Sequence, residues 1–273
     1  MPICELVSWS YEESVIIFDI NGTLYQLWIL LVNIRKTWTG MNHLAIRIKS
    51  QPTISTCGPT CLHSIYAFYG DKIPLDQLIS EIPELTGGGT LGVQLGSHAL
   101  ARGYDVTIYS HNLRVFDPTW FELSKTQQID KLESQIKAKK HKTKLVQVSR
   151  HYQNFLLNGG DIKFESISPR FLNAFLKQKQ PVLTGLSATY LYKSAREYGD
   201  DCVYDDVKGE PQGHFVVISG MVDEGSRVFI ADPHEHNPVG GGKHYDVDTF
   251  DLISAILIGV ITYDANIIII KKK

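Results

Sequence analysis

Cys57 is the residue of this sequence whose surroundings best suit a nucleophile. It lies in the segment QPTISTCGPTCLHSIYAFYG, directly before a glycine and a proline. Proline suits the first turn of a helix but not its interior, so Cys57 is predicted at a helix start, with Ser55 or Thr56 as the N-cap. Unpaired backbone N–H groups and the positive end of the helix dipole stabilise a thiolate there, and a thiolate attacks carbonyl carbon.

A cysteine nucleophile also needs a base, a group that orients the base, and donors for the developing oxyanion. His214 opens an apolar stretch, HFVVISGMV, and Asp232 ends the next one, RVFIADP. Gln51 offers a side-chain N–H six residues before Cys57, and the backbone N–H of Cys57 is a second candidate donor. These four residues together predict nucleophilic acyl chemistry, although each of them alone suits an ordinary structural role.

The spacing of the two apolar stretches predicts that His214 and Asp232 touch. The letters DEG between them fit a three-residue hairpin loop with glycine in the left-handed position. Under that loop Val222 pairs with Ser226, Val216 faces Asp232, and His214 is the diagonal neighbour of Asp232 on the same face. Diagonal partners lie within reach of an imidazole–carboxylate hydrogen bond, which fixes the tautomer of the ring.

The motifs QPTISTCGPTCLHSIYAFYG, GHFVVISG and IADP, in that order, resemble the papain-like cysteine peptidases of family thirty-nine, which remove double-glycine leaders from bacteriocin precursors. The resemblance spans roughly residues 42–263 and implies an α+β papain-like fold, with an N-terminal helical lobe packed on a C-terminal antiparallel sheet. It implies that Cys57 is the nucleophile, His214 the general base and acid, Asp232 the orienting residue and Gln51 the oxyanion donor.

The resemblance further implies a peptide or protein substrate and no metal or organic cofactor. The family's best-known members are N-terminal domains of membrane transporters, whereas this sequence shows no transporter segments and is expected to be a stand-alone member. The long separation of Cys57 and His214 leaves room for a helical insertion around residues 111–160. Hydrolysis and acyl transfer to an amine share one thioester, so the sequence does not separate them, and a catalytically silent peptide-binding module is the main alternative.

Two weaker patterns suggest a metal or phosphate enzyme instead. VIIFDINGTL resembles the first motif of haloacid dehalogenase-type phosphatases, with Asp19 as the attacking residue and Asp200, Asp201 and Asp205 as distant metal ligands. The segment DPHEHNP places His234 and His236 at alternate positions, with Asp232 and His244 nearby, as a zinc or copper site needs. Separately, Cys61 is expected either to pack in the core or to form a regulatory disulfide with Cys57.

Composition narrows the class of protein. The chain has 273 residues, 43% hydrophobic and 10% aromatic, which is enough to bury a core and excludes a disordered chain. Its 27 basic and 29 acidic residues argue against a nucleic-acid partner. Four cysteines without a CxxC pair do not suit a secreted disulfide scaffold. No signal peptide is recognisable, and the longest apolar run is about half the ~20 residues of a membrane span, so a cytoplasmic protein is expected.

The periodicity predicts mainly helices up to residue 178 and mainly strands afterwards, which is an α+β pattern. Residues 1–40 are an N-terminal extension of uncertain status, either an appendage or sequence upstream of the true start at Met41, and residues 41–273 form the peptidase domain. The predicted helices cover residues 57–69, 74–82, 90–102, 124–140, 144–157 and 168–178. The predicted strands cover residues 43–48, 104–109, 181–186, 214–222, 227–231, 257–263 and 266–271.

Overall fold

The computed structural model describes residues 43–85, 88–199, 201–222, 225–240 and 242–273, together with two short strands near the N-terminus. The chain divides into two compact units, residues 1–41 and 42–273. In the first unit, β1 (Ile17–Phe18) and β2 (Leu24–Tyr25) pair antiparallel. The second unit contains all the other helices and strands that the structure describes.

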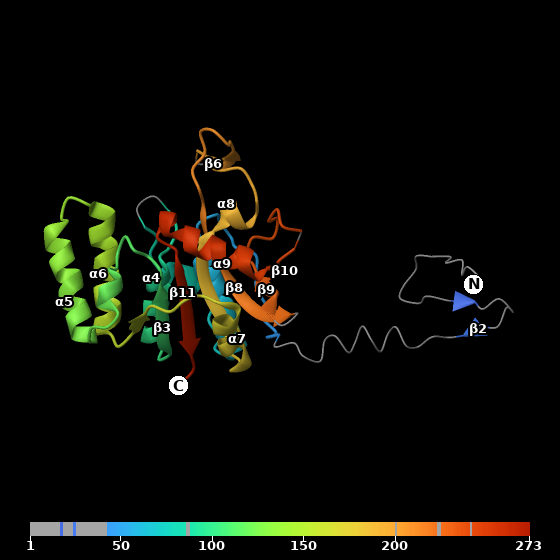
Figure 1. Ribbon diagram of the computed structural model, residues 1–273, viewed down its shortest axis with the longest axis horizontal. Coiled ribbons are helices and arrows are strands. Elements are labelled where there is room, and N and C mark those ends of the chain that lie inside the picture. Colours follow the sequence, from blue (N-terminus) through green and yellow to red (C-terminus); the bar gives the residue numbers. More distant parts are fainter. Residues whose placement is uncertain are drawn as a thin grey trace. The chain divides into compact units, whose positions relative to one another are not determined.

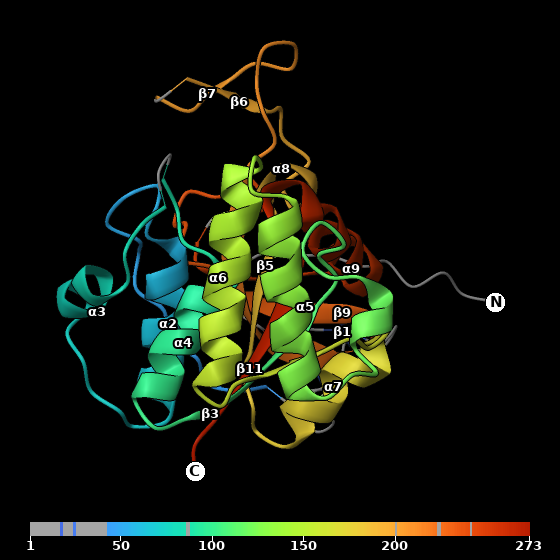
Figure 2. The ribbon, with the colours of Figure 1, turned by 90° about the vertical axis from the view of Figure 1, so that its left-hand side faces the viewer.

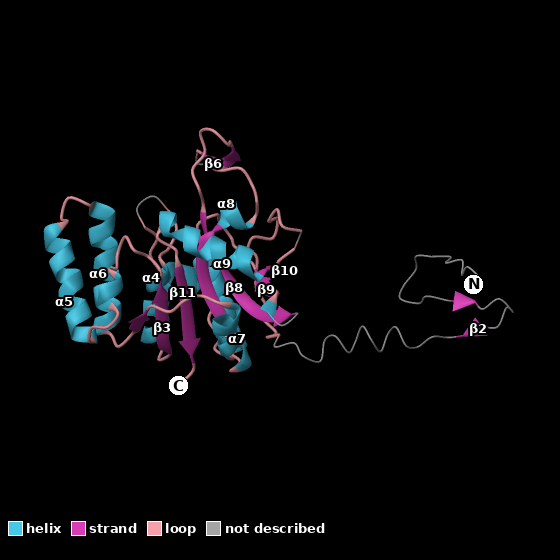
Figure 3. Cartoon of the chain, viewed as in Figure 1, coloured by secondary structure: helices cyan, strands magenta, loops and turns pink. Residues whose placement is uncertain are grey.

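A seven-stranded sheet forms the centre of the second unit, in the order β10-β9-β8-β5-β11-β3-β4 (Figures 1 and 3). Neighbouring strands are antiparallel except β3 and β4, which are parallel. The α+β prediction is therefore confirmed, but strands from the helix-rich half join the same sheet. The strands are β3 (Asp105–Ser110), β4 (Asp161–Lys163), β5 (Val182–Ser187), β8 (Gly213–Val222), β9 (Arg227–Ala231), β10 (His244–Asp248) and β11 (Asn266–Lys271).

Helices cover both faces of the sheet. Figure 2 shows α2 and α4 on one side and α7 and α9 on the other, with the paired helices α5 and α6 standing outside α4. The helices are α2 (Cys57–Phe68), α3 (Leu75–Glu81), α4 (Gly92–Ala101), α5 (Lys125–Ala138), α6 (Thr143–Leu157), α7 (Pro169–Lys177), α8 (Ala188–Leu191) and α9 (Thr249–Ile258). The pair α5–α6 lies within the predicted helical insertion.

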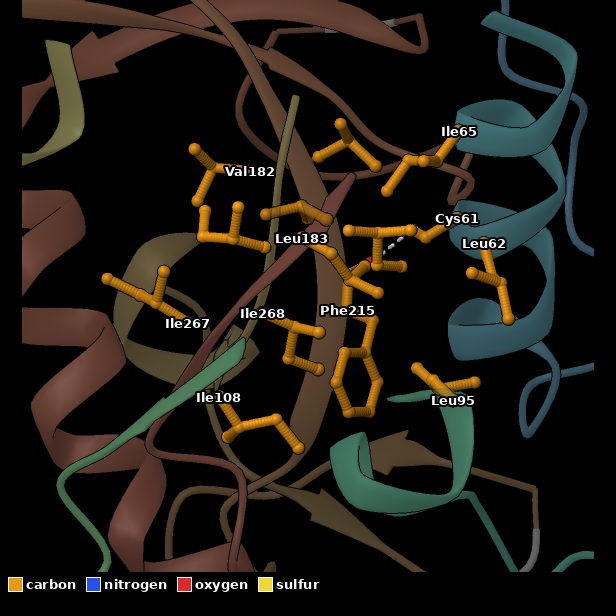
Figure 4. Packing of buried hydrophobic residues seen from close by; sticks show 14 of the residues in the cluster. Cys61, Leu62, Ile65, Leu95, Ile108, Val182, Leu183, Phe215, Ile267 and Ile268 are labelled. Atoms are coloured by element: carbon orange, nitrogen blue, oxygen red, sulfur yellow. Dashed lines mark hydrogen bonds between the residues drawn. The ribbon is translucent and has the colours of Figure 1, made fainter. Parts of the chain in front are cut away.

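The core that holds the site together lies between α2, α4 and the sheet. Figure 4 shows side chains of α2 and α4 facing apolar residues of β5, β8 and β11. Cys61 of α2 is completely buried, and its thiol donates a hydrogen bond of 3.2 Å to the carbonyl oxygen of Phe215 on β8. This contact ties the helix that begins at Cys57 to the strand that begins beside His214, which fixes their separation.

Two predicted strands are wrong. Residues 257–263 belong to the end of α9 and to a 3-10 turn, Gly259–Thr262. Their apolar run resembles a strand, but Asp248 starts a helix upstream because its carboxylate accepts hydrogen bonds from the N–H groups of Phe250 and Asp251. Residues 43–48 alternate between exposed and buried as predicted but form no regular strand.

Beyond the central sheet, β6 (Glu197–Tyr198) and β7 (Val203–Tyr204) pair in a small arm between α8 and β8, which rises at the top of Figure 1. Among the residues that the structure describes, no helix is both long and apolar enough to cross a bilayer.

Candidate active site

Cys57 is the first residue of α2, as predicted, and its side chain is almost fully buried. Thr56 occupies the N-cap position, but its hydroxyl donates to the carbonyl oxygen of Thr53 rather than accepting from the helix. The other predicted cap, Ser55, donates to Glu84. No side chain therefore caps the start of α2, so its first N–H groups remain available to an anion beside Cys57.

His214 and Asp232 form the predicted hydrogen bond. The Nε2 atom of His214 lies 2.8 Å from Oδ1 of Asp232, and both side chains are buried. This leaves Nδ1 of the ring for a second partner, and Cys57 lies close enough to raise the pKa of the ring. Three residues separated by 157 and 18 positions in the sequence thus meet where α2 begins, β8 begins and β9 ends.

The electrostatic environment favours the charged form of His214. Burial by itself lowers the pKa of the imidazole, but the nearby charges of Asp232 and Cys57 and the hydrogen bond to Asp232 raise that pKa to about 10. The ring is therefore an imidazolium at neutral pH, and it places a positive charge beside Cys57.

Asp232 is satisfied completely by protein donors. Its Oδ1 accepts from His214 and from the backbone N–H of His234 at 2.8 Å, and its Oδ2 accepts from the hydroxyl groups of Tyr192 at 2.8 Å and Tyr245 at 2.6 Å. Burial raises the pKa of this carboxyl, but the charge of His214 and these hydrogen bonds outweigh burial, so the pKa is lowered overall. The carboxylate is held both in position and in its charged form.

The strand register that brings His214 to Asp232 differs from the predicted one at the turn. Val222 pairs with Arg227, one residue beyond the predicted partner Ser226. A bulge between Ile218 and Gly220 then shifts the pairing by one residue, so Val217 pairs with Ala231. The register beyond the bulge is the predicted one, which places Val216 opposite Asp232.

The hairpin loop itself is only partly described. Residues 223 and 224 of the predicted loop lie outside the described residues, and Gly225 has a φ of 99°, in the left-handed region. The connection is one residue longer than the sequence predicted, and the bulge at Ser219 compensates for that residue. The predicted contact between the imidazole of His214 and the carboxylate of Asp232 therefore forms.

Gln51 lies in the loop before α2 with its amide engaged locally. Its Nε2 donates to the carbonyl oxygens of Thr53 at 3.0 Å and Ile54 at 3.4 Å, and its Oε1 is buried without a hydrogen-bond partner. Its backbone N–H donates to the carbonyl oxygen of Pro233, one residue after Asp232. The residue is thus anchored next to the site, but its side chain does not line the cavity described next.

An open cavity of 280 Å³ lies beside Cys57. It is bounded by the loop before α2, the loop before α4, the start of α6 and the segment just before His214, so it offers a substrate chain access to the sulfur. The lining residues are Ile54, Ser55, Cys57, Leu85, Gly88, Gly89, Thr90, Leu91, Lys144, Gln212, Gly213, Phe215, Thr262 and Asp264.

The patterns that suggested a metal or phosphate enzyme find little support. Asp19 and Asp200 lie outside the described residues. Asp205 accepts hydrogen bonds from the backbone N–H groups of Val207 and Lys208, and so shapes its own loop. Across the described segments, no three His, Cys, Asp or Glu side chains gather as a metal would require, including those around His234, His236 and His244.

Three residues of the site were not recognised from the sequence. Tyr192 follows α8, Tyr245 lies on β10 and Asp264 precedes β11. Burial, followed by the charge of Asp232, raises the pKa of both tyrosines far above the ordinary value, so their hydroxyls stay protonated donors. No spacing signal marks these residues, because each joins the site through the order of strands in the sheet. Cys61 packs in the core, one of the two alternatives considered for it.

Three comparisons with known proteins place this geometry in context. A family model described as "Peptidase_C39 like family" matches residues 43–253. None of the curated proteins is detectably similar to the chain.

Among solved structures, a double glycine motif protease from an AMS/PCAT transporter, crystallised with its leader peptide, is 12% identical with a TM-score of 0.41, and the match covers 85% of this chain and 94% of that chain. A Bacillus anthracis protein named as a C39-like peptidase is 13% identical with a TM-score of 0.42, and the match covers 84% of this chain and 96% of that chain.

Proposed function

Because the chain belongs to the Peptidase C39-like family, we propose that it is a cysteine peptidase that cleaves a peptide or amide bond with Cys57, His214 and Asp232. The observation that supports the proposal is the buried His214 ring, which is hydrogen-bonded to Asp232 and lies close enough to Cys57 that the cysteine raises the pKa of the ring. If His214 and Asp232 only stabilised the fold, there would be no reason for a cysteine to lie beside them. Cys57 lies there, at an uncapped helix start beside an open cavity.

The proposed reaction proceeds through a thioester. The Cys57 sulfur attacks the carbonyl carbon, and the carbonyl π electrons move onto the oxygen to give a tetrahedral intermediate. When the C–N bond breaks, the His214 imidazolium gives its proton to the leaving amine. Water then attacks the thioester while His214 takes a proton from it, and Cys57 leaves as the thiolate. Asp232 keeps the ring oriented throughout.

The proposed oxyanion donors are the backbone N–H of Cys57 and the side-chain amide of Gln51. The backbone N–H belongs to the uncapped start of α2 and needs no rearrangement. Gln51 must first give up a hydrogen bond to its own loop, and the longer one, 3.4 Å to the carbonyl oxygen of Ile54, is the weaker of the two. We therefore propose that substrate binding turns the Gln51 amide toward the cavity.

Alkylation by iodoacetamide tests the proposal without a known substrate. The modified residue is identified by mass spectrometry over a range of pH in the parent protein, in Cys57→Ala and in His214→Ala. We expect selective modification of Cys57 below about pH 7, because the imidazolium maintains a thiolate, and loss of that selectivity in His214→Ala. Cys202→Ala is the matched control and should leave the Cys57 rate unchanged.

Equal and slow alkylation of all four cysteines would contradict the proposal. A second measurement separates a peptidase from a silent peptide-binding module. New N-termini generated from a peptide library by the parent protein but not by Cys57→Ala indicate cleavage. Selective labelling of Cys57 with no cleavage and no acyl-enzyme mass would favour the binding module.

A further inference from the structure

The cavity beside Cys57 contains a carboxyl group that the proposed reaction does not use. Asp264 lies between the 3-10 turn Gly259–Thr262 and β11, and it lines the same cavity as Cys57 and Gly213. Its side chain is more than nine-tenths buried, and its Oδ1 atom has no hydrogen-bond partner. A buried acceptor without a donor is costly, and such groups concentrate where a ligand supplies the missing partner.

The surrounding backbone makes room for this carboxyl at two glycines. A Cβ atom on Gly213 would collide with Oδ2 of Asp264, and one on Gly185 would lie 2.9 Å from the Asp264 Cβ. These glycines lie on the neighbouring strands β8 and β5, so the Asp264 side chain passes over β5 to reach the backbone directly before His214. Its own N–H is fixed by a 2.8 Å hydrogen bond to the carbonyl oxygen of Gly259.

The protein supplies little to offset the buried charge. Burial raises the pKa of Asp264 to about 7, and the nearby Thr262 hydroxyl and the charges of Lys144 and His214 counter only part of that effect. Burial, followed by the charge of Asp264, raises the pKa of Tyr152 on α6, whose hydroxyl donates to Asn266 rather than to Asp264. The ammonium group of Lys144 lies 4.9 Å from the ring centroid of Tyr263, on the exposed start of α6. Lys144 is therefore an exposed neighbour at the rim, with its ammonium group over the Tyr263 ring, rather than a buried partner of Asp264.

The cavity contains a second unsatisfied atom, the Thr90 hydroxyl oxygen, which is also buried without a partner. The remaining walls are mixed, and Leu91 and Phe215 supply apolar surface among polar side chains such as Gln212. A long side chain with an apolar stem and a charged, donor-rich end fits this arrangement, because the stem contacts the walls and the end reaches Asp264 and Thr90.

We propose that Asp264 makes this cavity a specificity subsite for a substrate residue with a cationic side chain, arginine or lysine. The proposal rests on the proposed peptidase function, since the subsite adjoins Cys57. The cation donates to Oδ1 and neutralises the carboxylate, whereas a neutral side chain of equal size leaves that charge buried and uncompensated. Lys144 moves away from the rim when the substrate cation enters.

The test uses tripeptide acyloxymethyl ketones, which alkylate an active-site cysteine, with arginine or its neutral isostere citrulline at one position at a time. The second-order rate of Cys57 alkylation is measured by intact-protein mass spectrometry on the full chain. At one position we expect arginine to react at least about 10-fold faster than citrulline at pH 8. Asp264→Asn should reduce that ratio to within about 2-fold, and Asp130→Asn, which changes an exposed residue of α5, should preserve it.

The wild-type protein alone provides a second readout. The arginine-to-citrulline ratio should fall between pH 8 and pH 5.5, as Asp264 takes up a proton. Iodoacetamide rates measured in parallel correct for changes in the nucleophile. If Cys57 reacts selectively with iodoacetamide but the arginine-to-citrulline ratio is near one at every position and pH, the subsite proposal is wrong while the peptidase proposal stands. If Cys57 shows no selective reaction with iodoacetamide, the peptidase proposal is wrong, and the subsite proposal that rests on it is wrong as well.

Discussion

Asp232 and Asp264 are both buried carboxyl groups near His214, and their surroundings are opposite. Asp232 accepts four hydrogen bonds and faces the charged imidazole, so its pKa is lowered despite burial. Asp264 has one oxygen without a partner, and burial raises its pKa to about 7. Burial alone therefore does not determine the state of a carboxyl; the number and charge of its donors do.

The difference in hydrogen-bond donors suits Asp232 and Asp264 to different roles in the proposed site. The protein supplies hydrogen-bond donors to both oxygens of Asp232, as suits a residue that orients a catalytic base. It leaves one oxygen of Asp264 without a donor at the wall of an open cavity, as suits a residue that contacts a substrate. Four experiments test this contrast.

The largest expected effect is the loss of stability in Asp232→Ala. The substitution leaves a buried charge on His214 and two tyrosine hydroxyls without their acceptor, so we expect the free energy of unfolding to fall by about 3–5 kcal/mol. Urea unfolding measures it, with exposed Asp130→Ala as the control, expected within about 0.5 kcal/mol of the parent. A loss below about 1 kcal/mol in Asp232→Ala would show that the Asp232 shell is not stabilising.

Asp264→Asn is expected to change stability in the opposite direction. Between pH 4 and pH 7 the folded state holds a proton on Asp264 that the unfolded state has lost, so the parent protein loses stability as pH rises through this window. The amide removes that dependence, and we expect it to stabilise the protein by about 2–4 kcal/mol at pH 8 and by almost nothing at pH 4. Urea unfolding at both pH values is the measurement. A difference that is independent of pH would mean that Asp264 does not titrate there.

Cys57 reactivity should depend on one carboxyl and not on the other. In Asp232→Asn the ring loses the negative charge that maintains its imidazolium form, so we expect iodoacetamide labelling of Cys57 at pH 6.5 to slow by about 100-fold. Asp264→Asn should change the rate by less than about 2-fold, since the role we propose for it is in substrate selection. Equal slowing in both variants would remove the distinction between an orienting and a selecting carboxyl.

The smallest effect concerns the two tyrosines that complete the Asp232 shell. Tyr192→Phe and Tyr245→Phe each delete one hydrogen bond to Oδ2, and we expect each to lower the free energy of unfolding by about 1 kcal/mol. Tyr198→Phe, at an exposed position of the arm, is the matched control and should be neutral. If the buried variants unfold like the control, His214 and the His234 N–H suffice to hold Asp232.

Much of the secondary structure followed from local physics. The six predicted helices and five of the seven predicted strands lie where periodicity placed them, because each depends on which face of one segment is apolar, whereas α8, α9, β4, β6, β7 and β10 were not predicted. Residues 257–263 were predicted wrongly because an apolar run does not distinguish a buried helix from a strand, and the deciding feature was a cap eight or more residues upstream, at Asp248. The His214–Asp232 contact was predicted through a register that is wrong at the turn and right beyond the bulge at Ser219.

The sequence by itself predicted the type of chemistry from a cysteine at a helix start, a histidine and an aspartate on consecutive apolar stretches, and motifs that resemble those of one peptidase family. Those features are local, so neighbouring residues suffice to reveal them. The tertiary structure decided how the site is completed, because Tyr192, Tyr245 and Asp264 reach it only through the order of strands in the sheet. Whether a buried carboxyl finds hydrogen-bond donors depends on side chains from segments that are distant in the sequence. The spacing of residues along the chain does not reveal which of those side chains come together.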